Sequence, residues 1–245
     1  MDYNPAIDAA GHVLMVRFGI FLSLLAFAGA ARAADTGSDH FARFAPEVRA
    51  FAARNGLAAR AATTLFIGSS SIRLWDLPHS FPGIAASNHG FGGATTPDVL
   101  HYYRDLIAGE RPATVVVYVG ENDIAEGRPP RSVVGDVLEL LRRLRSDLPQ
   151  SRLIYLSMKP SPARWSLWPK MAEANMAIRS NAAALGFQYV DVGSALLTEA
   201  GAPNPAYFRA DGLHMNAAGY ALWNEMIDDL IAPAVERPTR SASVS

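Results

Sequence analysis

The sequence contains no cysteine among its 245 residues. This absence excludes disulfide bonds, thiolate metal sites and a cysteine nucleophile, so covalent catalysis would have to use an oxygen or a lysine nitrogen. An excess of one charge is also missing, because 22 basic and 23 acidic residues are interspersed and give a formal net charge of −1. A nucleic-acid-binding protein usually carries a basic stripe or tail, so this distribution argues against nucleic acid as a partner.

Long apolar runs are scarce, and the main one lies near the N-terminus, in MVRFGIFLSLLAFAGAARAADT (15–36). It begins with a single basic residue, Arg17, continues with an apolar stretch from 18 to 30, and ends on Ala31-Arg32-Ala33, the small-x-small pattern of a signal-peptidase site. A membrane anchor is the alternative, but the apolar stretch is shorter than the roughly 20 residues that a spanning helix needs.

We therefore expect residues 1–33 to be a signal peptide that is cleaved before Ala34, with translation starting at Met1 or Met15. The mature protein would then be exported, either periplasmic or secreted, and would keep no stable membrane span. Without a cysteine, a lipoprotein anchor is excluded.

Short β-branched or aliphatic runs alternate with segments whose apolar residues recur every three or four positions. The runs cover 63–68, 114–120, 152–157 and 187–192, with a weaker candidate at 84–88, and the helical segments cover 97–108, 132–148, 168–185 and 216–231. Uniformly apolar strands separated by amphipathic helices predict a parallel sheet that is covered on both faces. The expected fold class is α/β, a single three-layer α/β/α domain with a central, mostly parallel five-stranded sheet.

The domain is expected to span residues 63–235. Ahead of it, residues 34–62 form a link and a helix whose aromatic residues have helical spacing, so this helix should pack on the domain. Residues 236–245 have the composition of a flexible tail.

Three consecutive serines, Ser69 to Ser71, follow the first predicted strand in FIGSSSIRLW (66–75). Ligands of parallel α/β sheets bind outside the carboxyl ends of the strands, so a hydroxyl at this turn can face the crevice while helix N–H groups face an anion. Taken alone, the same serines could simply cap the following helix.

Three more polar blocks follow later strands or precede the last helix: SNHGFGGATTPD (87–98), YVGEND (118–123) and ADGLHMNAAGY (210–220). The glycines of the first block fit neither a Walker loop nor a dinucleotide fingerprint. Taken alone, the first two blocks would be turns. In the third, Asp211 and His214 have a spacing that can bring a carboxylate to one nitrogen of an imidazole.

The Asp-x-x-His spacing occurs three times, so spacing alone identifies no site. His79 lies nine residues past Ser70, roughly 13 Å along if the intervening segment is a regular helix. His101 lies inside an amphipathic segment. His214 differs from both, because it precedes the final helix in a loop at the expected mouth of the sheet.

In their order, the four blocks resemble the SGNH, or GDSL-type, hydrolases, a family of serine esterases and lipases. The resemblance covers residues 63–232, and Ser69 stands where the family usually has aspartate. Another serine hydrolase fold is disfavoured, since Ile72 occupies the fifth position of the Gly-x-Ser-x-Gly signature of α/β-hydrolases.

The resemblance implies a catalytic triad and an oxyanion hole. The implied residues are Ser70, His214 and Asp211 for the triad, and Ser70, Gly93 and Asn122 for the hole. It further implies hydrolysis of acyl esters through a covalent acyl-enzyme, without a metal or organic cofactor. Small acyl esters, lipids or acylated sugars would be substrates. The alternatives are an O-acyltransferase or a deacetylase acting on envelope or plant polysaccharide, and a non-catalytic binding module.

The segment KPSPARWSLWPK (159–170) follows a predicted strand and should overhang the same mouth. Trp165 and Trp168 could line an acyl or sugar site there. Equally, the two indoles could pack the start of the next helix, with Ser166 as its cap.

Overall fold

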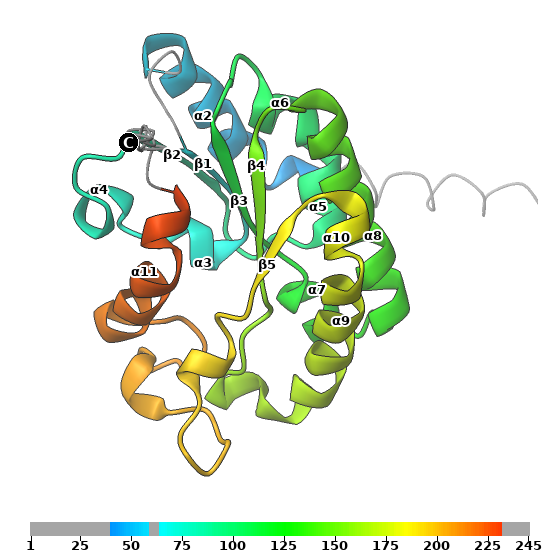
Figure 1. Cartoon of the computed structure of the whole chain (residues 1–245), viewed down its shortest axis with the longest axis vertical. Helices are drawn as coiled ribbons and strands as arrows, with labels where there is room; N and C mark the ends of the chain where they lie inside the picture. Colours follow the sequence, from blue (N-terminus) through cyan, green and yellow to red (C-terminus); the bar gives the residue numbers. More distant parts are fainter. Residues whose placement is uncertain (1–39, 59–63, 232–245) are drawn as a thin grey trace, which may run out of the picture. The chain divides into compact units, whose positions relative to one another are not determined.

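The computed structural model describes residues 40–58 and 64–231 (Figure 1). The expected signal peptide and the expected C-terminal tail lie outside the described residues. None of the helices within these two ranges has the length and hydropathy needed to span a membrane.

Five parallel strands form the central sheet, in the order β2-β1-β3-β4-β5. Their bounds are β1 Thr64–Gly68, β2 Ala86–Gly90, β3 Thr114–Tyr118, β4 Arg152–Leu156 and β5 Gln188–Val190. All five predicted strands are confirmed, with ends shifted by a few residues. The weak signal of β2 has a physical cause, since an edge strand is half exposed and its sequence ASNHG can be polar.

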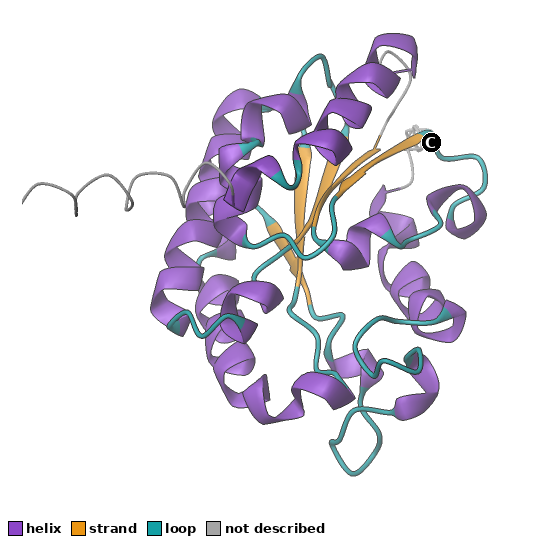
Figure 2. Cartoon of the chain, turned by 180° about the vertical axis from the view of Figure 1, so that it is seen from behind, coloured by secondary structure: helices purple, strands orange, loops and turns teal. Residues whose placement is uncertain are grey.

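Helices cover both faces of the sheet and complete the predicted three-layer α/β/α fold (Figure 2). The main helices are α2 Ala45–Ala58, α3 Ser70–Arg73, α4 Leu77–Ser80, α5 Thr96–His101, α6 Tyr103–Ile107, α7 Glu121–Ala125, α8 Pro130–Asp147, α9 Trp168–Ser180, α10 Ala182–Leu185 and α11 Ala217–Ile231. Short 3-10 turns occur at η1 Pro162–Leu167, η2 Ser194–Leu196 and η3 Pro205–Tyr207.

Alternate strand residues enter two separate cores because successive side chains of a strand point to opposite faces. Leu65 and Val115 pack with α2, α5, α6, α8 and α9, whereas Phe66 and Val116 pack with α3, α4 and α11. The serine block at 69–71 and the Asp-x-x-His block at 211–214, which lie far apart in sequence, therefore adjoin helices of the same layer.

Two helical predictions and one turn prediction need correction. The segments 97–108 and 168–185 are each two helices. The first is broken at Tyr102, where the backbone leaves the α region with φ of −90° and ψ of 9°. The second is broken at Asn181, which separates α9 from α10 although its φ of −93° and ψ of −4° stay in the right-handed α region. The third correction concerns α7, which occupies a segment that the sequence predicts as a turn. It starts after Gly120, whose φ of +112° favours glycine.

Gly68 joins β1 to α3 in very little space. Its φ is +149°, and a Cβ added there would lie 1.9 Å from the carbonyl oxygen of Tyr118 on β3. The next residue, Ser69, donates its N–H to that same oxygen over 3.1 Å. The end of β1 is thus held against β3, and the chain enters α3 at Ser70.

Replacing Gly68 by alanine should therefore be costly. We expect Gly68→Ala to lower the free energy of unfolding by roughly 3 kcal/mol or more, because the new methyl group meets backbone atoms that cannot change rotamer. Gly135 offers a matched control, since it is exposed in α8 and nothing lies within 4 Å of an added Cβ.

Gly135→Ala should raise the free energy of unfolding by about 0.5–1 kcal/mol, through the better helix propensity of alanine. Urea unfolding of both variants measures the difference. Equal stability of the two variants would contradict this description of the β1–α3 junction.

Candidate active site

Ser70 is the first residue of α3 and lies at the carboxyl end of β1. Its neighbours Ser69 and Ser71 are buried, whereas Ser70 is partly exposed. Ser69 occupies the N-cap position of α3, but its side chain makes no capping hydrogen bond. Of the three hydroxyls, that of Ser70 is therefore the one open to a ligand.

His214 reaches Ser70 from the loop between η3 and α11. Its Nε2 lies 3.1 Å from Ser70 Oγ, and its Nδ1 lies 2.7 Å from Asp211 Oδ2. Asp211 also accepts the backbone N–H groups of Leu213 and His214, both over 2.9 Å. The structure thus brings three of the predicted residues into one continuous hydrogen-bonded chain.

The hydrogen bonds to Asp211 indicate which ring nitrogen of His214 carries a proton. The imidazole of His214, followed by the two backbone N–H groups, holds the pKa of the Asp211 carboxyl well below its ordinary value. An ionised carboxylate can only accept, so Nδ1 of His214 carries a proton. Nε2 of a neutral ring is then free to accept the hydroxyl proton of Ser70.

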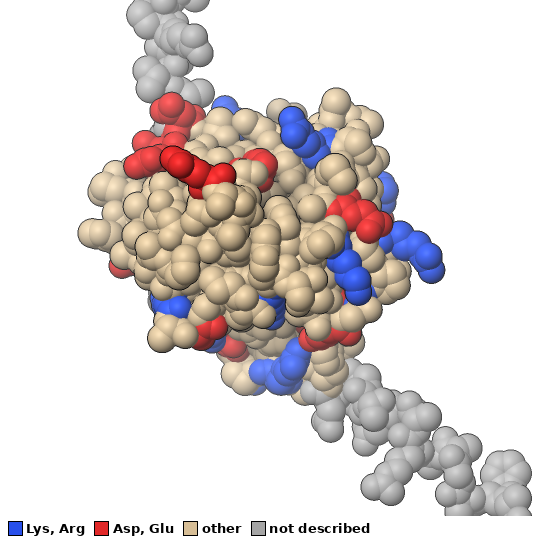
Figure 3. Space-filling view, turned by 90° about the horizontal axis from the view of Figure 1, so that it is seen from below, with Lys and Arg blue, Asp and Glu red and all other residues tan. Residues whose placement is uncertain are grey.

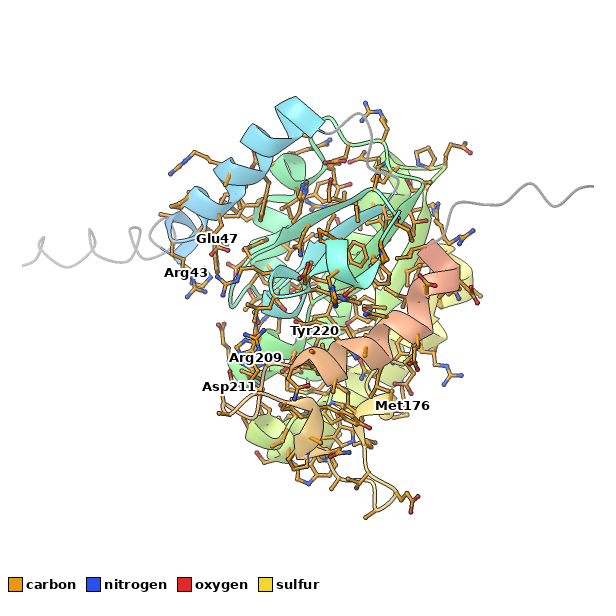
Figure 4. All side chains as sticks on the ribbon, turned by 90° about the vertical axis from the view of Figure 1, so that its left-hand side faces the viewer. Arg43, Glu47, Met176, Arg209, Asp211 and Tyr220 are labelled. Carbon is orange, nitrogen blue, oxygen red and sulfur yellow. The ribbon has the colours of Figure 1, made fainter. Side chains whose placement is uncertain are left out.

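Hydrogen bonds within the loop that carries Asp211 and His214 hold it in place. Figure 4 labels Arg209 and Asp211 of this loop, and Tyr220 of α11. Arg209 donates its N–H to the His214 carbonyl over 2.8 Å and its Nε to the Met215 carbonyl over 3.0 Å. The hydroxyl of Tyr220, on α11, donates to the carbonyl of Ser71 over 2.8 Å. The Arg209 bonds close the loop on itself directly ahead of α11, and the Tyr220 bond fixes α11 to α3, so His214 and Ser70 keep their relative positions.

The other two Asp-x-x-His pairs cap helices or stack on an aromatic ring. Asp76 is the N-cap of α4 and accepts the backbone N–H of His79 over 3.3 Å. Asp98 forms a capping box with Thr95 on α5, and the ring of His101 stacks on Phe41 at 3.9 Å. Within residues 40–58 and 64–231, Asp211 and His214 are the pair of this spacing whose carboxylate reaches the ring.

Asn122 contacts the turn after β2, the turn that contains Gly93. Asn122 lies in the first turn of α7 and donates Nδ2 to the carbonyl of Ala94 over 2.9 Å. Gly93 has a φ of +75°, and an added Cβ would contact nothing within 4 Å, so this glycine borders open space. No hydrogen bond joins the N–H of Ser70 or of Gly93 to another described residue.

A buried cluster of charged residues next to Asn122 escaped the sequence analysis. It consists of Glu121 on α7, Lys159 after β4 and Arg164 in η1. One available signal was the presence of Glu121 and Lys159 directly beside apolar strands, where a charge needs a partner. The sequence does not show that these two charges meet, because they are 38 residues apart.

The two tryptophans predicted as lining residues stack on each other, with ring centroids 6.4 Å apart. Trp165 is 39% exposed. Trp168 begins α9 and lines a shallow groove of about 130 Å³ together with Met176, Tyr189 and Asp191. The residues that line this groove do not include Ser70, His214 or Asp211.

Comparison with known proteins gives a family for the chain. The model of the GDSL-like Lipase/Acylhydrolase family matches residues 75–222, more than half of the chain. The match includes Asn122, Asp211 and His214, whereas Ser70 precedes it. No curated protein matches the sequence significantly.

Several solved structures share the fold. A protein of Streptococcus pneumonia named for platelet activating factor superposes with a TM-score of 0.72 and 21% identity, covering 80% of this chain and 97% of that one. A GDSL-like lipase from Bacteroides thetaiotaomicron gives 0.65 and 24%, covering 78% and 96%. A variant of the acetylxylan esterase Axe2 from Geobacillus stearothermophilus gives 0.56 and 16%, covering 69% and 93%.

These identities are too low to show more than a shared fold, and the sequence match supplies the family. The chain belongs to the GDSL-like lipase/acylhydrolase family and is an ester-hydrolysing enzyme.

Proposed function

We propose that the chain is an exported serine esterase that hydrolyses acyl esters through the triad Ser70, His214 and Asp211. The observation that carries the proposal is the unbroken hydrogen-bonded chain, with 3.1 Å between Ser70 Oγ and His214 Nε2 and 2.7 Å between His214 Nδ1 and Asp211 Oδ2. This is the arrangement in which a histidine can activate a serine and a carboxylate can hold the ring.

In the acylation step, Ser70 Oγ attacks the ester carbonyl carbon while His214 Nε2 takes the hydroxyl proton. Asp211 stabilises the imidazolium that forms. The tetrahedral intermediate then collapses: the bond to the alcohol oxygen breaks, and the proton on Nε2 passes to the leaving alcohol. The acyl group stays on Ser70 as an ester.

In the deacylation step, a water molecule takes the place of the alcohol. His214 accepts a proton from this water as its oxygen adds to the acyl carbon. The bond to Ser70 Oγ breaks, the proton returns to Oγ, and the carboxylic acid leaves. Both steps place a negative charge on the former carbonyl oxygen.

Three donors are proposed to stabilise this oxyanion: the N–H groups of Ser70 and Gly93 and the side-chain amide of Asn122. Asn122 Nδ2 has two hydrogens, and the bond to the Ala94 carbonyl uses one of them. The second is available to the oxyanion. The open space beside Gly93 supports a ligand at this position.

Acylated sugars are the second substrate class to consider. The stacked pair of Trp165 and Trp168 offers an exposed aromatic surface of the kind that packs against sugar rings, and one solved structure of the same fold is an acetylxylan esterase. The molecular face that carries the loops after β4 and β5 has a broad uncharged centre with charges of both signs around it (Figure 3). Uncharged esters therefore suit this surface. Faster hydrolysis of acetylated xylo-oligosaccharide than of nitrophenyl acetate would favour acylated sugars as the substrate class.

The export part of the proposal rests on the sequence of residues 15–33. We expect the mature chain to begin at Ala34, because Ala31-Arg32-Ala33 has the pattern of a signal-peptidase site. N-terminal sequencing of the periplasmic or secreted protein measures this. A mature chain that keeps residues 18–30 would instead indicate a membrane anchor.

The triad is tested by histidine variants for which the chain supplies its own controls. His214→Ala should lower kcat by about a million-fold and Asp211→Ala by about ten-thousand-fold, as in other serine triads. His79→Ala and His101→Ala should keep kcat within about tenfold of the unmodified enzyme, because their partners are a helix cap and a Phe41 ring.

Hydrolysis of nitrophenyl acetate and of acetylated xylo-oligosaccharide, measured for all four variants, gives the comparison. An active His214→Ala variant beside an inactive His101→Ala variant would overturn the assignment.

A further inference from the structure

Three charged side chains converge directly behind Asn122. Lys159 Nζ donates to Glu121 Oε2 over 2.7 Å, and Arg164 Nη1 donates to Glu121 Oε1 over 2.9 Å. The hydroxyl of Tyr118, at the end of β3, also donates to Glu121. The side chains of Lys159 and Glu121 are 1% and 4% exposed, so a charge pair lies in the interior of the protein.

The cluster carries one more positive charge than it needs for neutrality. Burial alone would raise the pKa of the Glu121 carboxyl, but the positive charges of Lys159 and Arg164 outweigh it, so that the pKa is lowered and Glu121 is ionised. Lys159 by itself would balance that charge. A buried unbalanced charge is costly, and Arg164 at 19% exposure keeps partial contact with water.

Arg164 uses the same nitrogen to contact Asn122. Its Nη1 lies 3.0 Å from Asn122 Oδ1, in addition to its bond with Glu121. A guanidinium can only donate, and the Ala94 carbonyl at the other end of the Asn122 amide can only accept. The two partners together fix which way the amide is turned, because a flipped amide would place donor against donor and acceptor against acceptor.

We propose that Arg164 is a positioning residue for Asn122, which holds the amide with Nδ2 toward the oxyanion and polarises it for that role. This inference rests on the proposed function, in which Asn122 is an oxyanion donor. Glu121 anchors the guanidinium, and Lys159 neutralises Glu121 so that the charge of Arg164 remains effective at the amide.

The effect belongs to the transition state. When the carbonyl oxygen becomes negative, the oxyanion, the Asn122 amide and the Arg164 guanidinium form a series of two hydrogen bonds whose dipoles reinforce each other. The neutral ester carbonyl of the bound substrate gains much less from the same series. Loss of Arg164 should therefore lower kcat and leave KM almost unchanged.

A double-mutant cycle between Arg164 and Asn122 tests the inference. Arg164→Met should lower kcat for nitrophenyl acetate by about 10- to 30-fold, with KM within about twofold, as expected for a residue coupled to an oxyanion donor. Asn122→Ala alone should lower kcat by about 100- to 1,000-fold. In the Asn122→Ala background, Arg164→Met should cost no more than about twofold further, because the amide through which Arg164 acts is gone.

Arg128→Met is the matched control. Arg128 is also a partly buried arginine that serves α7, but it pairs with Asp123 and Asp136 and makes no bond to Asn122. Its loss should lower the melting temperature and change kcat by less than about threefold. If Arg164→Met does not fold, Arg164→Lys keeps a positive charge near Glu121 on a shorter side chain that does not extend as far as Nη1, and should show the same pattern with smaller changes in kcat.

Equal kcat losses from Arg164→Met in both backgrounds, or a loss confined to KM, would overturn the inference. A fully active Asn122→Ala variant would overturn it as well. In either case, the dependence of hydrolysis on Ser70 and His214 would be unaffected, so failure of this inference is distinguishable from failure of the proposed esterase.

Discussion

The contact between the end of β1 and Tyr118 on β3 is the constraint on which the site depends. The Tyr118 carbonyl accepts the N–H of Ser69, and Gly68 is the residue that allows this approach. The Tyr118 hydroxyl donates to Glu121, at the start of α7. One residue of the central strand therefore fixes the serine turn on one side and the Asn122 helix on the other. Because β1 and β3 are parallel neighbours, their carboxyl ends place both groups at the same edge of the sheet.

The second half of the site comes from the far end of the chain and depends on α11. Tyr220 bonds to the Ser71 carbonyl, and Trp75 donates to Asn224 over 2.9 Å. The loop ahead of α11 is linked to η1 as well, where Ala163 donates its N–H to the Gly212 carbonyl over 3.0 Å. The segment that carries Arg164 and the loop that carries His214 are thus tied together, which connects the proposed oxyanion donor with the proposed base.

Much of this arrangement could be predicted from the sequence, and the rest has identifiable causes. Apolar runs predicted the strands other than β2 because buried parallel strands have a simple pattern, whereas the polar edge strand β2 gave only a weak signal. Ordered motifs indicated which histidine lies beside Ser70. The breaks at Tyr102 and Asn181 left no mark in the apolar periodicity. The cluster of Glu121, Lys159 and Arg164 was missed because its members lie on three separate segments, and a pattern along the chain does not show which distant charges meet.

The central claim is that Ser70, and neither neighbouring serine, forms the covalent intermediate. Reaction with a fluorophosphonate followed by intact mass measurement and peptide mapping tests it most directly, because this reagent traps an activated serine as a stable phosphonyl ester. The account predicts one adduct per chain, located on Ser70. An adduct on Ser69 or Ser71, or an active enzyme that remains unlabelled, would contradict it.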